Sequence, residues 1–204
     1  MIQRLVLYLY LFGLAVFQAC QSGTSTAVTG PLVSAIHTDG QVVLSDSTSV
    51  LIPHYGDTAY TIFYCVRHAE KIKNAGDNPG LTPEGEARAK RLGKILSAVP
   101  LEKACPTNFK RTVLTAELAR KEMTEPPPAE ACPPDFQVMW VDEKLSTGTG
   151  KQYLIVGHSN TIPQLLNHLK GGTEFADIPD EEYGKFYIVV SKGIGQTEVL
   201  QLQY

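Results

Sequence analysis

The 204-residue sequence lacks a surplus of basic residues. It has 18 lysines and arginines against 21 aspartates and glutamates, and its formal net charge is -3. Binding to nucleic acid depends on many lysine and arginine contacts to phosphates. The composition therefore argues against a nucleic acid as partner, and any anion site has to be built locally. Internal repeats are also absent, and a content of 43% hydrophobic and 19% charged residues is typical of a single globular domain.

Cysteine is scarce, with four residues in the whole chain: Cys20, Cys65, Cys105 and Cys132. They form no Cys-x-x-Cys motif and no His/Cys cluster with zinc spacing, so we predict no structural metal. Cys65 lies inside an apolar run and is expected in the core. Cys105 and Cys132 each stand beside prolines, and they either form a disulfide or remain free thiols.

The N-terminal apolar run is too short for a membrane span. It covers thirteen residues, 5–17, whereas a spanning helix needs about 20. It follows Arg4 and precedes Ala19-Cys20, a pattern that resembles a bacterial lipoprotein signal in which Cys20 is lipidated. Ordinary secretory cleavage near Ala19 and an uncleaved anchor are the alternatives. All three predict a domain outside the cytoplasm, in the periplasm or cell envelope, and the first predicts a membrane anchor at Cys20.

Composition divides the chain into three parts. Residues 1–20 are the signal peptide with its lipobox, and residues 21–31 are small and polar, as in a flexible tether. Residues 32–204 form the globular domain. Its first part, 32–59, is expected to be an irregular β-rich lead-in, because Asp39-Gly40 between short apolar stretches is a hairpin signal.

The rest of the chain alternates between strand and helix patterns. Thr82 is the expected N-cap of the first helix, with Pro83 at its first position. Only a loop or a single turn is expected between 141 and 151. The predicted strands cover 60–66, 102–105, 136–141, 151–157, 185–192 and 197–204, and the predicted helices 81–99, 109–123 and 160–172. This alternation predicts an α/β domain of three layers, α/β/α, with a mostly parallel central sheet.

Two predicted strands end at a histidine. His68 follows the strand 60–66 and His158 follows the strand 151–157, at the edge where such sheets bind ligands. Arg67 precedes His68. Arg111 opens the second helix, where a cation is slightly unfavourable unless an anion lies beside it. Two arginines and two histidines at one edge suit a phosphoryl dianion.

Each residue of this set has a chemical task in such a site. Guanidinium groups give planar bidentate donors to phosphate oxygens, and a neutral imidazole can attack phosphorus. A second imidazole can hold an equatorial oxygen, together with N–H groups at Ser159 and Asn160, where the third helix begins. No metal or other cofactor is required if cationic side chains supply the positive charge.

The stretches "RHAE" at 67–70, "RTVLTAE" at 111–117 and "VGHSN" at 156–160 resemble the histidine phosphatase superfamily, also called the phosphoglycerate-mutase-like group. The similarity runs over residues 60–204, and with the N-terminal signal it indicates an exported lipoprotein member with an RHAE sequence. It implies that His68 is the nucleophile and forms a phosphohistidine. It also implies that Arg67, Arg111 and His158 form the phosphate pocket.

The general acid is less clearly marked. The mutase branch of this family usually has a glutamate in a Glu-Gly loop beyond the second arginine, and "KEMTEPPPAEACPPD" has no Glu-Gly pair. Glu70 is the carboxylate nearest to His68 in sequence, and it is either the general acid or an ion-pair partner of Lys71. The acidic stretch 177–186 is expected to be a solvated turn, or else to repel anions near the pocket.

These observations predict a metal-independent phosphohydrolase of the histidine acid phosphatase type that acts on a small phosphomonoester. A non-catalytic lipoprotein that binds a phosphorylated ligand is the alternative from another class. A phosphomutase is disfavoured by the missing Glu-Gly loop and by export. The sequence does not choose an oligomeric state.

Overall fold

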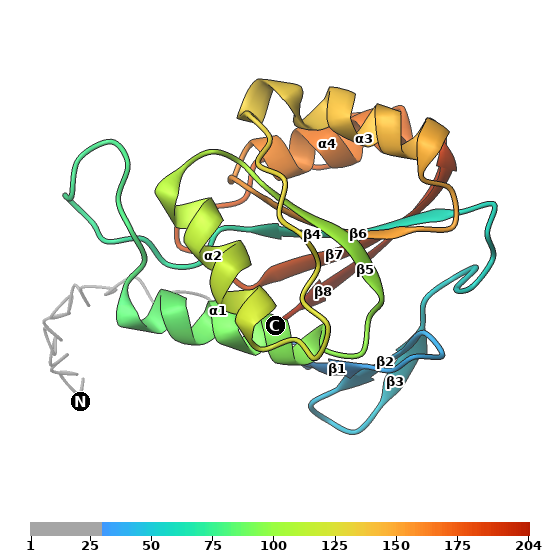
Figure 1. Ribbon diagram of the computed structural model, residues 1–204, viewed down its shortest axis with the longest axis horizontal. Helices are drawn as coiled ribbons and strands as arrows, with labels where there is room; N and C mark the ends of the chain where they lie inside the picture. Colours follow the sequence, from blue (N-terminus) through green and yellow to red (C-terminus); the bar gives the residue numbers. More distant parts are fainter. Residues whose placement is uncertain (1–29) are drawn as a thin grey trace, which may run out of the picture.

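The computed structural model describes residues 30–204 (Figure 1). The predicted signal peptide, Cys20 and nearly all of the tether lie outside these residues. Within the described part, no helix combines the length and the apolar character that crossing a membrane requires.

A five-stranded sheet forms the centre of the domain, with the strand order β5-β6-β4-β7-β8. Its strands are β4 (Thr61–Arg67), β5 (Leu101–Pro106), β6 (Gln152–Gly157), β7 (Lys185–Gly193) and β8 (Gln196–Gln203). β6 pairs in parallel with both β4 and β5, whereas β7 is antiparallel to both β4 and β8. The sheet is therefore mixed, and the expected parallel arrangement holds only for its β5-β6-β4 half.

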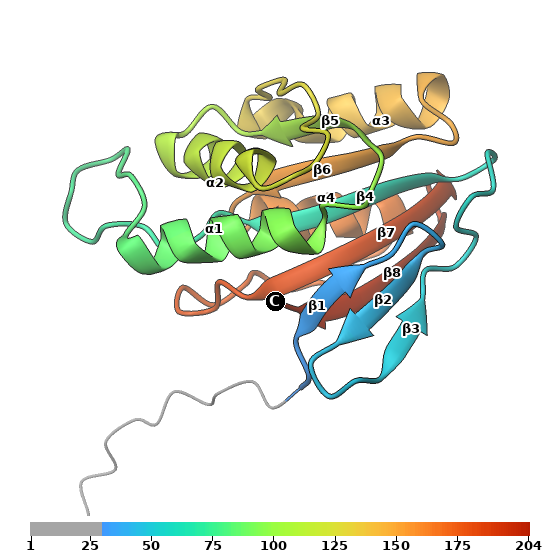
Figure 2. The same cartoon turned by 60° about the horizontal axis from the view of Figure 1, so that its bottom comes forward.

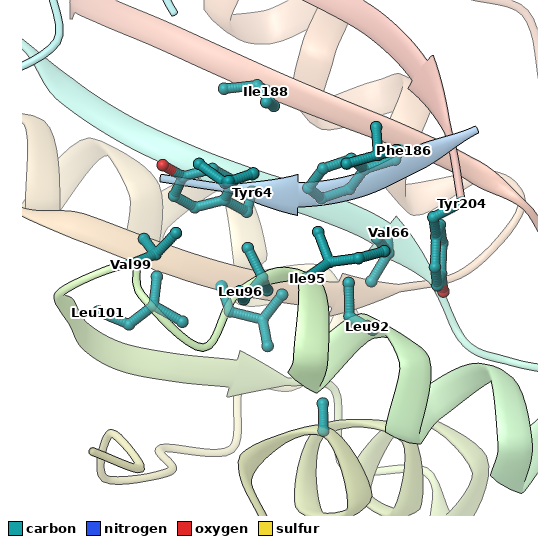
Figure 3. Packing of buried hydrophobic residues seen from close by; sticks show 14 of the residues in the cluster. Tyr64, Val66, Leu92, Ile95, Leu96, Val99, Leu101, Phe186, Ile188 and Tyr204 are labelled. Atoms are coloured by element: carbon teal, nitrogen blue, oxygen red, sulfur yellow. The ribbon is translucent and has the colours of Figure 1, made fainter. Parts of the chain in front are cut away.

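Helices cover both faces of this sheet, which confirms the three-layer α/β/α prediction. α1 (Pro83–Ile95) and α2 (Lys110–Lys121) lie on one face, and α3 (Gln137–Thr147) and α4 (Thr161–Lys170) on the other (Figures 1 and 2). Successive residues of a strand point to opposite faces. In β4, Tyr64 and Val66 pack in the same cluster as Leu92 of α1 (Figure 3), while Phe63 and Cys65 pack with α3 and α4.

Residues 32–59, the expected β-rich lead-in, form a small antiparallel sheet beside β7 and β8 (Figure 2). Its strands are β1 (Val33–Ile36), β2 (Gln41–Leu44) and β3 (Ser49–Leu51). Gly40 makes the turn after β1 with a φ of 83°, and a Cβ there would lie 2.4 Å from the Tyr55 ring. Side chains of this sheet join the core cluster that α1 covers, so the lead-in completes that face of the domain.

The prediction of a strand at 136–141 was wrong, and so was the loop expected between 141 and 151. The segment forms a 3₁₀ turn, η1 (Pro134–Phe136), followed by α3. The buried residues of α3 are Gln137, Trp140, Val141 and Lys144. Their spacing of three, four and seven residues is helical, and the apolar run was too short to distinguish the two patterns.

The start of α1 fixes the chain just after His68. Thr82 caps the helix by accepting a 3.1 Å hydrogen bond from the Gly85 N–H. The Thr82 N–H donates to the Glu70 carbonyl at 2.9 Å. A Cβ on Gly85 would lie 2.3 Å from that same carbonyl oxygen, so glycine allows the helix to approach this closely.

Candidate active site

The ends of β4 and β6 bring the two histidines to one edge of the sheet. Arg67 lies opposite Gly157 in the parallel ladder, and the His68 N–H donates to the Gly157 carbonyl at 2.9 Å. The centroids of the His68 and His158 rings are 5.5 Å apart. The in-register pairing therefore places both rings in one site.

A cavity of about 300 Å³ opens at this edge. Six of the predicted site residues line it: Arg67, His68, Arg111, His158, Ser159 and Asn160. Five others line it that the sequence had not marked: Lys71, Phe109, Pro134, Thr161 and Asp180. Its size suits a small ligand, and the charges of Arg67 and Arg111 favour an anion there.

His68 is buried and held in one tautomer. Its Nδ1 lies 2.8 Å from the Ala69 carbonyl oxygen, which can only accept a hydrogen bond, so Nδ1 carries the proton. Nε2 is then unprotonated, and it has no hydrogen-bond partner among residues 30–204. An unprotonated nitrogen on a ring that lines the cavity is what a nucleophile requires.

His158 has both ring nitrogens engaged. Arg111 Nη2 lies 3.3 Å from Nδ1, and because a guanidinium only donates, Nδ1 accepts. Nε2 therefore carries the proton and donates to the Thr107 hydroxyl at 2.8 Å. That hydroxyl lies 2.8 Å from the Thr112 hydroxyl, which donates to the Phe109 carbonyl at 2.7 Å. This chain of hydrogen bonds suits His158 to positioning rather than to attack.

Both histidines are neutral near pH 7. Burial lowers the pKa of His68 to about 3, the charges of Arg67 and Arg111 contribute to that lowering, and the hydrogen bond to Ala69 opposes it. Burial also lowers the pKa of His158 to about 4, helped by the charges of Arg111 and Arg67. The His68 ring therefore keeps its nucleophilic form well into the acid range.

Each of the two arginines carries a buried donor that no group among residues 30–204 satisfies. The Nε atoms of Arg67 and Arg111 are buried and have no partner in the described chain. Arg111 lies 4.6 Å from the Phe109 ring centroid and Arg67 lies 4.4 Å from that of Tyr183. Burial and the charge of Arg67 lower the pKa of Arg111. An anion between the two guanidinium groups would relieve this repulsion and accept both N–H groups.

Two helices begin at the cavity. α4 starts at Thr161, directly after Ser159 and Asn160, and Asn160 makes no side-chain cap bond. The first turn of α2 contains Arg111 and no acidic residue. Helix N-termini favour an anion, so both helices contribute to the same electrostatic preference.

The threonines of "RTVLTAE" fix the segment that carries the nucleophile. Thr115, fully buried in α2, accepts a 3.0 Å hydrogen bond from the Ala69 N–H and donates to the Arg111 carbonyl at 2.7 Å. The stretch therefore links the His68 segment to the helix turn that presents Arg111.

Glu70 lies apart from the cavity. Its carboxylate receives two bonds from Arg88 Nε, at 2.8 and 3.0 Å, and a third from Arg88 Nη2 at 2.8 Å. The ion-pair partner is thus Arg88 rather than Lys71, which lines the cavity instead. With its oxygens engaged by Arg88, Glu70 has a structural task.

The acidic stretch 177–186 lies partly at the site, as the alternative of acidic residues near the pocket expected and the solvated turn did not. β7 is antiparallel to β4, with Phe186 opposite Val66. The start of β7 therefore lies at the same edge as the end of β4, and the loop before it brings Asp180 and Tyr183 to Arg67. The antiparallel pairing of β7 with β4 is the signal that would have predicted the position of Asp180 and Tyr183.

Three cysteines lie within the described residues, all of them buried. Cys105 and Cys132 form a disulfide, which the sequence had left open. Cys65 is free and buried, and its predicted place in the core is confirmed. In the part of the chain that the structure describes, no three His, Cys, Asp or Glu side chains are grouped so as to hold a metal ion.

The segment with Arg67, His68 and Arg111 matches a known family. Residues 63–132, roughly a third of the chain, match the model of the histidine phosphatase superfamily, branch 1. No curated protein sequence matches the chain. The matched segment contains three of the predicted site residues, Arg67, His68 and Arg111.

Solved structures of phosphatases share the fold. The protein histidine phosphatase SixA, solved with tungstate, is similar with a TM-score of 0.59 and 17% identity, over 70% of this chain and 96% of that one. A mycobacterial glucosyl-3-phosphoglycerate phosphatase has a TM-score of 0.56 and 9% identity, over 71% and 98%. The phosphoserine phosphatase of Entamoeba histolytica has a TM-score of 0.51 and 12% identity, over 71% and 97%. At such identities the similarity concerns the fold, and it confirms the predicted fold class.

Proposed function

We propose that the protein is a metal-independent phosphohydrolase that works through a phosphohistidine on His68. The observation that carries the proposal is the state of this ring: neutral, protonated at Nδ1 and lining a cavity that two arginines share. A neutral nucleophile beside fixed positive charge is suited to attack on a phosphate dianion.

The reaction has two steps. In the first, His68 Nε2 attacks phosphorus, a P–N bond forms and the P–O bond to the leaving group breaks. In the second, water attacks the same phosphorus, the P–N bond breaks and inorganic phosphate leaves. Arg67, Arg111 and the N–H groups at the start of α4 hold the charged oxygens in both steps, and most of the catalysis comes from this positioning.

The substrate is a small phosphomonoester. The cavity of about 300 Å³ has room for a phosphoryl group together with a small leaving group. Lys71 lines the cavity and is placed to meet a negative charge there. The similar folds include a protein histidine phosphatase and phosphatases of small molecules, so the fold does not choose among these leaving groups.

A panel of phosphomonoesters tests this function. With the purified full chain in excess chelator, we expect release of inorganic phosphate from at least one ester at an undiminished rate. Tight phosphate binding with no release from any ester would instead favour a binding lipoprotein. Release that stops on chelation would contradict the metal-independent reaction.

We further propose that the protein is exported and anchored to a membrane through a lipid on Cys20. The signal-like N-terminus supports this, and so does the Cys105–Cys132 disulfide, because disulfides persist in oxidising compartments. A Cys20→Ala variant is expected to leave the membrane fraction on cell fractionation. Continued membrane association of the variant would contradict the anchor.

A further inference from the structure

Asp180 is the one carboxylate that lines the cavity in the described chain. The hydrolase proposed above needs a group that gives a proton to the leaving oxygen and later takes one from water. We propose that Asp180 is this general acid and base, an inference that rests on the proposed phosphohydrolase function.

The backbone around Asp180 is fixed at the mouth of the cavity. Arg67 Nη1 lies 2.8, 3.1 and 3.2 Å from the carbonyl oxygens of Pro179, Asp180 and Glu182. On the other side of Asp180 in sequence, the Ile178 N–H donates to the Ser159 carbonyl at 2.9 Å. These bonds link the loop to Arg67, which precedes His68, and to Ser159, which follows His158.

The side chain, in contrast, is mostly exposed and is held by a single side-chain contact in the described chain. Asp180 is 82% exposed, and its Oδ1 accepts one bond of 3.3 Å, from Arg67 Nη2. A group that must reach a leaving oxygen and later a water has to be mobile on a fixed backbone. Asp180 meets both conditions.

The contact between Asp180 and Arg67 suggests how a bound substrate would release the Asp180 carboxyl group for catalysis. Nη2 and Nε form one edge of the guanidinium, and Nε is buried without a partner among residues 30–204. Such an edge matches two phosphate oxygens. A phosphate dianion that binds there displaces the Asp180 carboxylate from Arg67 and leaves it beside the substrate.

The other carboxylates near the site are engaged elsewhere or do not reach it. Glu70 is paired with Arg88, and Glu182 with Lys185 at 3.1 Å. Asp135, Asp177 and Glu181 are exposed and do not line the cavity. His158 already donates to Thr107 and accepts from Arg111. Asp180 is thus the carboxyl group that can take part without breaking a buried contact.

The proton balance is complete. As the P–O bond breaks, protonated Asp180 gives its proton to the leaving oxygen, which departs as an alcohol. Asp180, now a carboxylate, accepts a proton from the water that attacks phosphohistidine. Phosphate leaves, His68 returns to its neutral form and Asp180 is again protonated.

The test compares Asp180→Asn with wild type on two esters. Glycerol 2-phosphate has a poor leaving group and needs the acid, whereas p-nitrophenyl phosphate has a good one and does not. We expect kcat/KM to fall by about 100-fold or more on the first and by less than about threefold on the second. Because water activation is also lost, p-nitrophenol should appear in a burst equal to the enzyme concentration.

Asp177→Asn, in the same loop and outside the cavity, is the matched control and should behave as wild type on both esters. Equal losses on the two esters in Asp180→Asn, or no loss, would overturn the proposal. So would a leaving-group-dependent loss in Glu70→Gln, which would assign the acid to Glu70. A wild type that releases no phosphate from either ester would overturn the phosphohydrolase itself, a result separate from all of these.

Discussion

Replacing His68 by alanine is expected to lower kcat/KM for phosphomonoester hydrolysis by on the order of 10⁴-fold or more. His68 alone combines a neutral ring, an unprotonated Nε2 and a place at the cavity. Without this nitrogen there is no covalent intermediate, and water would have to attack the phosphoester directly. The rate of phosphate release at saturating and at low ester concentration measures the loss.

The control for this variant is His37→Ala, which makes the same change at an exposed residue outside the cavity. It should retain the wild-type rate. Since a buried side chain is removed in His68→Ala, thermal unfolding of both variants should accompany the assay. A folded His68→Ala variant that keeps more than about a tenth of wild-type activity would contradict the role of nucleophile.

Replacing Arg111 by alanine is expected to lower kcat/KM by about 10² to 10³, the usual loss for one preorganised donor to a developing charge. Arg111 offers a buried Nε without a partner in the described chain, and its Nη2 holds His158 by Nδ1. Both the direct contact to phosphate and the orientation of His158 would be lost. Inorganic phosphate should also bind more weakly, which calorimetry measures.

Two further variants make this prediction specific. Arg111→Lys keeps the charge without the planar fork, so it should lie between Arg111→Ala and wild type. Lys121→Ala removes an exposed cation from the other end of α2 and should be neutral. Equal losses for Arg111→Ala and Lys121→Ala, with wild-type activity in Arg111→Lys, would show that general charge, rather than a fixed donor, explains the effect.

The placement of both histidines could be predicted because it depends on local order. A buried strand ending at His68 and another ending at His158 meet at one edge whenever the two strands are parallel, and β4 and β6 are. Arg67 and Ser159 follow from the same geometry, since each adjoins one of these histidines. Helix α1 could also be predicted from the sequence, because its Thr82 N-cap and the proline at its first position are local signals.

The parts that were missed depend on contacts between distant segments. The direction of β7 is set by its pairing with β4, and that pairing carries Asp180 to the cavity. The 136–141 segment has the composition of a strand, but its packing on the far face of the sheet makes it a helix. Glu70 is two residues from His68 in sequence, yet Arg88 of α1 determines where its carboxylate lies.

The central claim is that His68 carries the phosphoryl group during turnover, and trapping of the intermediate tests it most directly. The full chain is mixed with p-nitrophenyl phosphate, quenched in alkali, where phosphohistidine survives, and digested for mass spectrometry. We expect one phosphorylated peptide, containing His68, that is absent from His68→Ala. A phosphoryl group on His158, or turnover with no phosphorylated peptide, would contradict it.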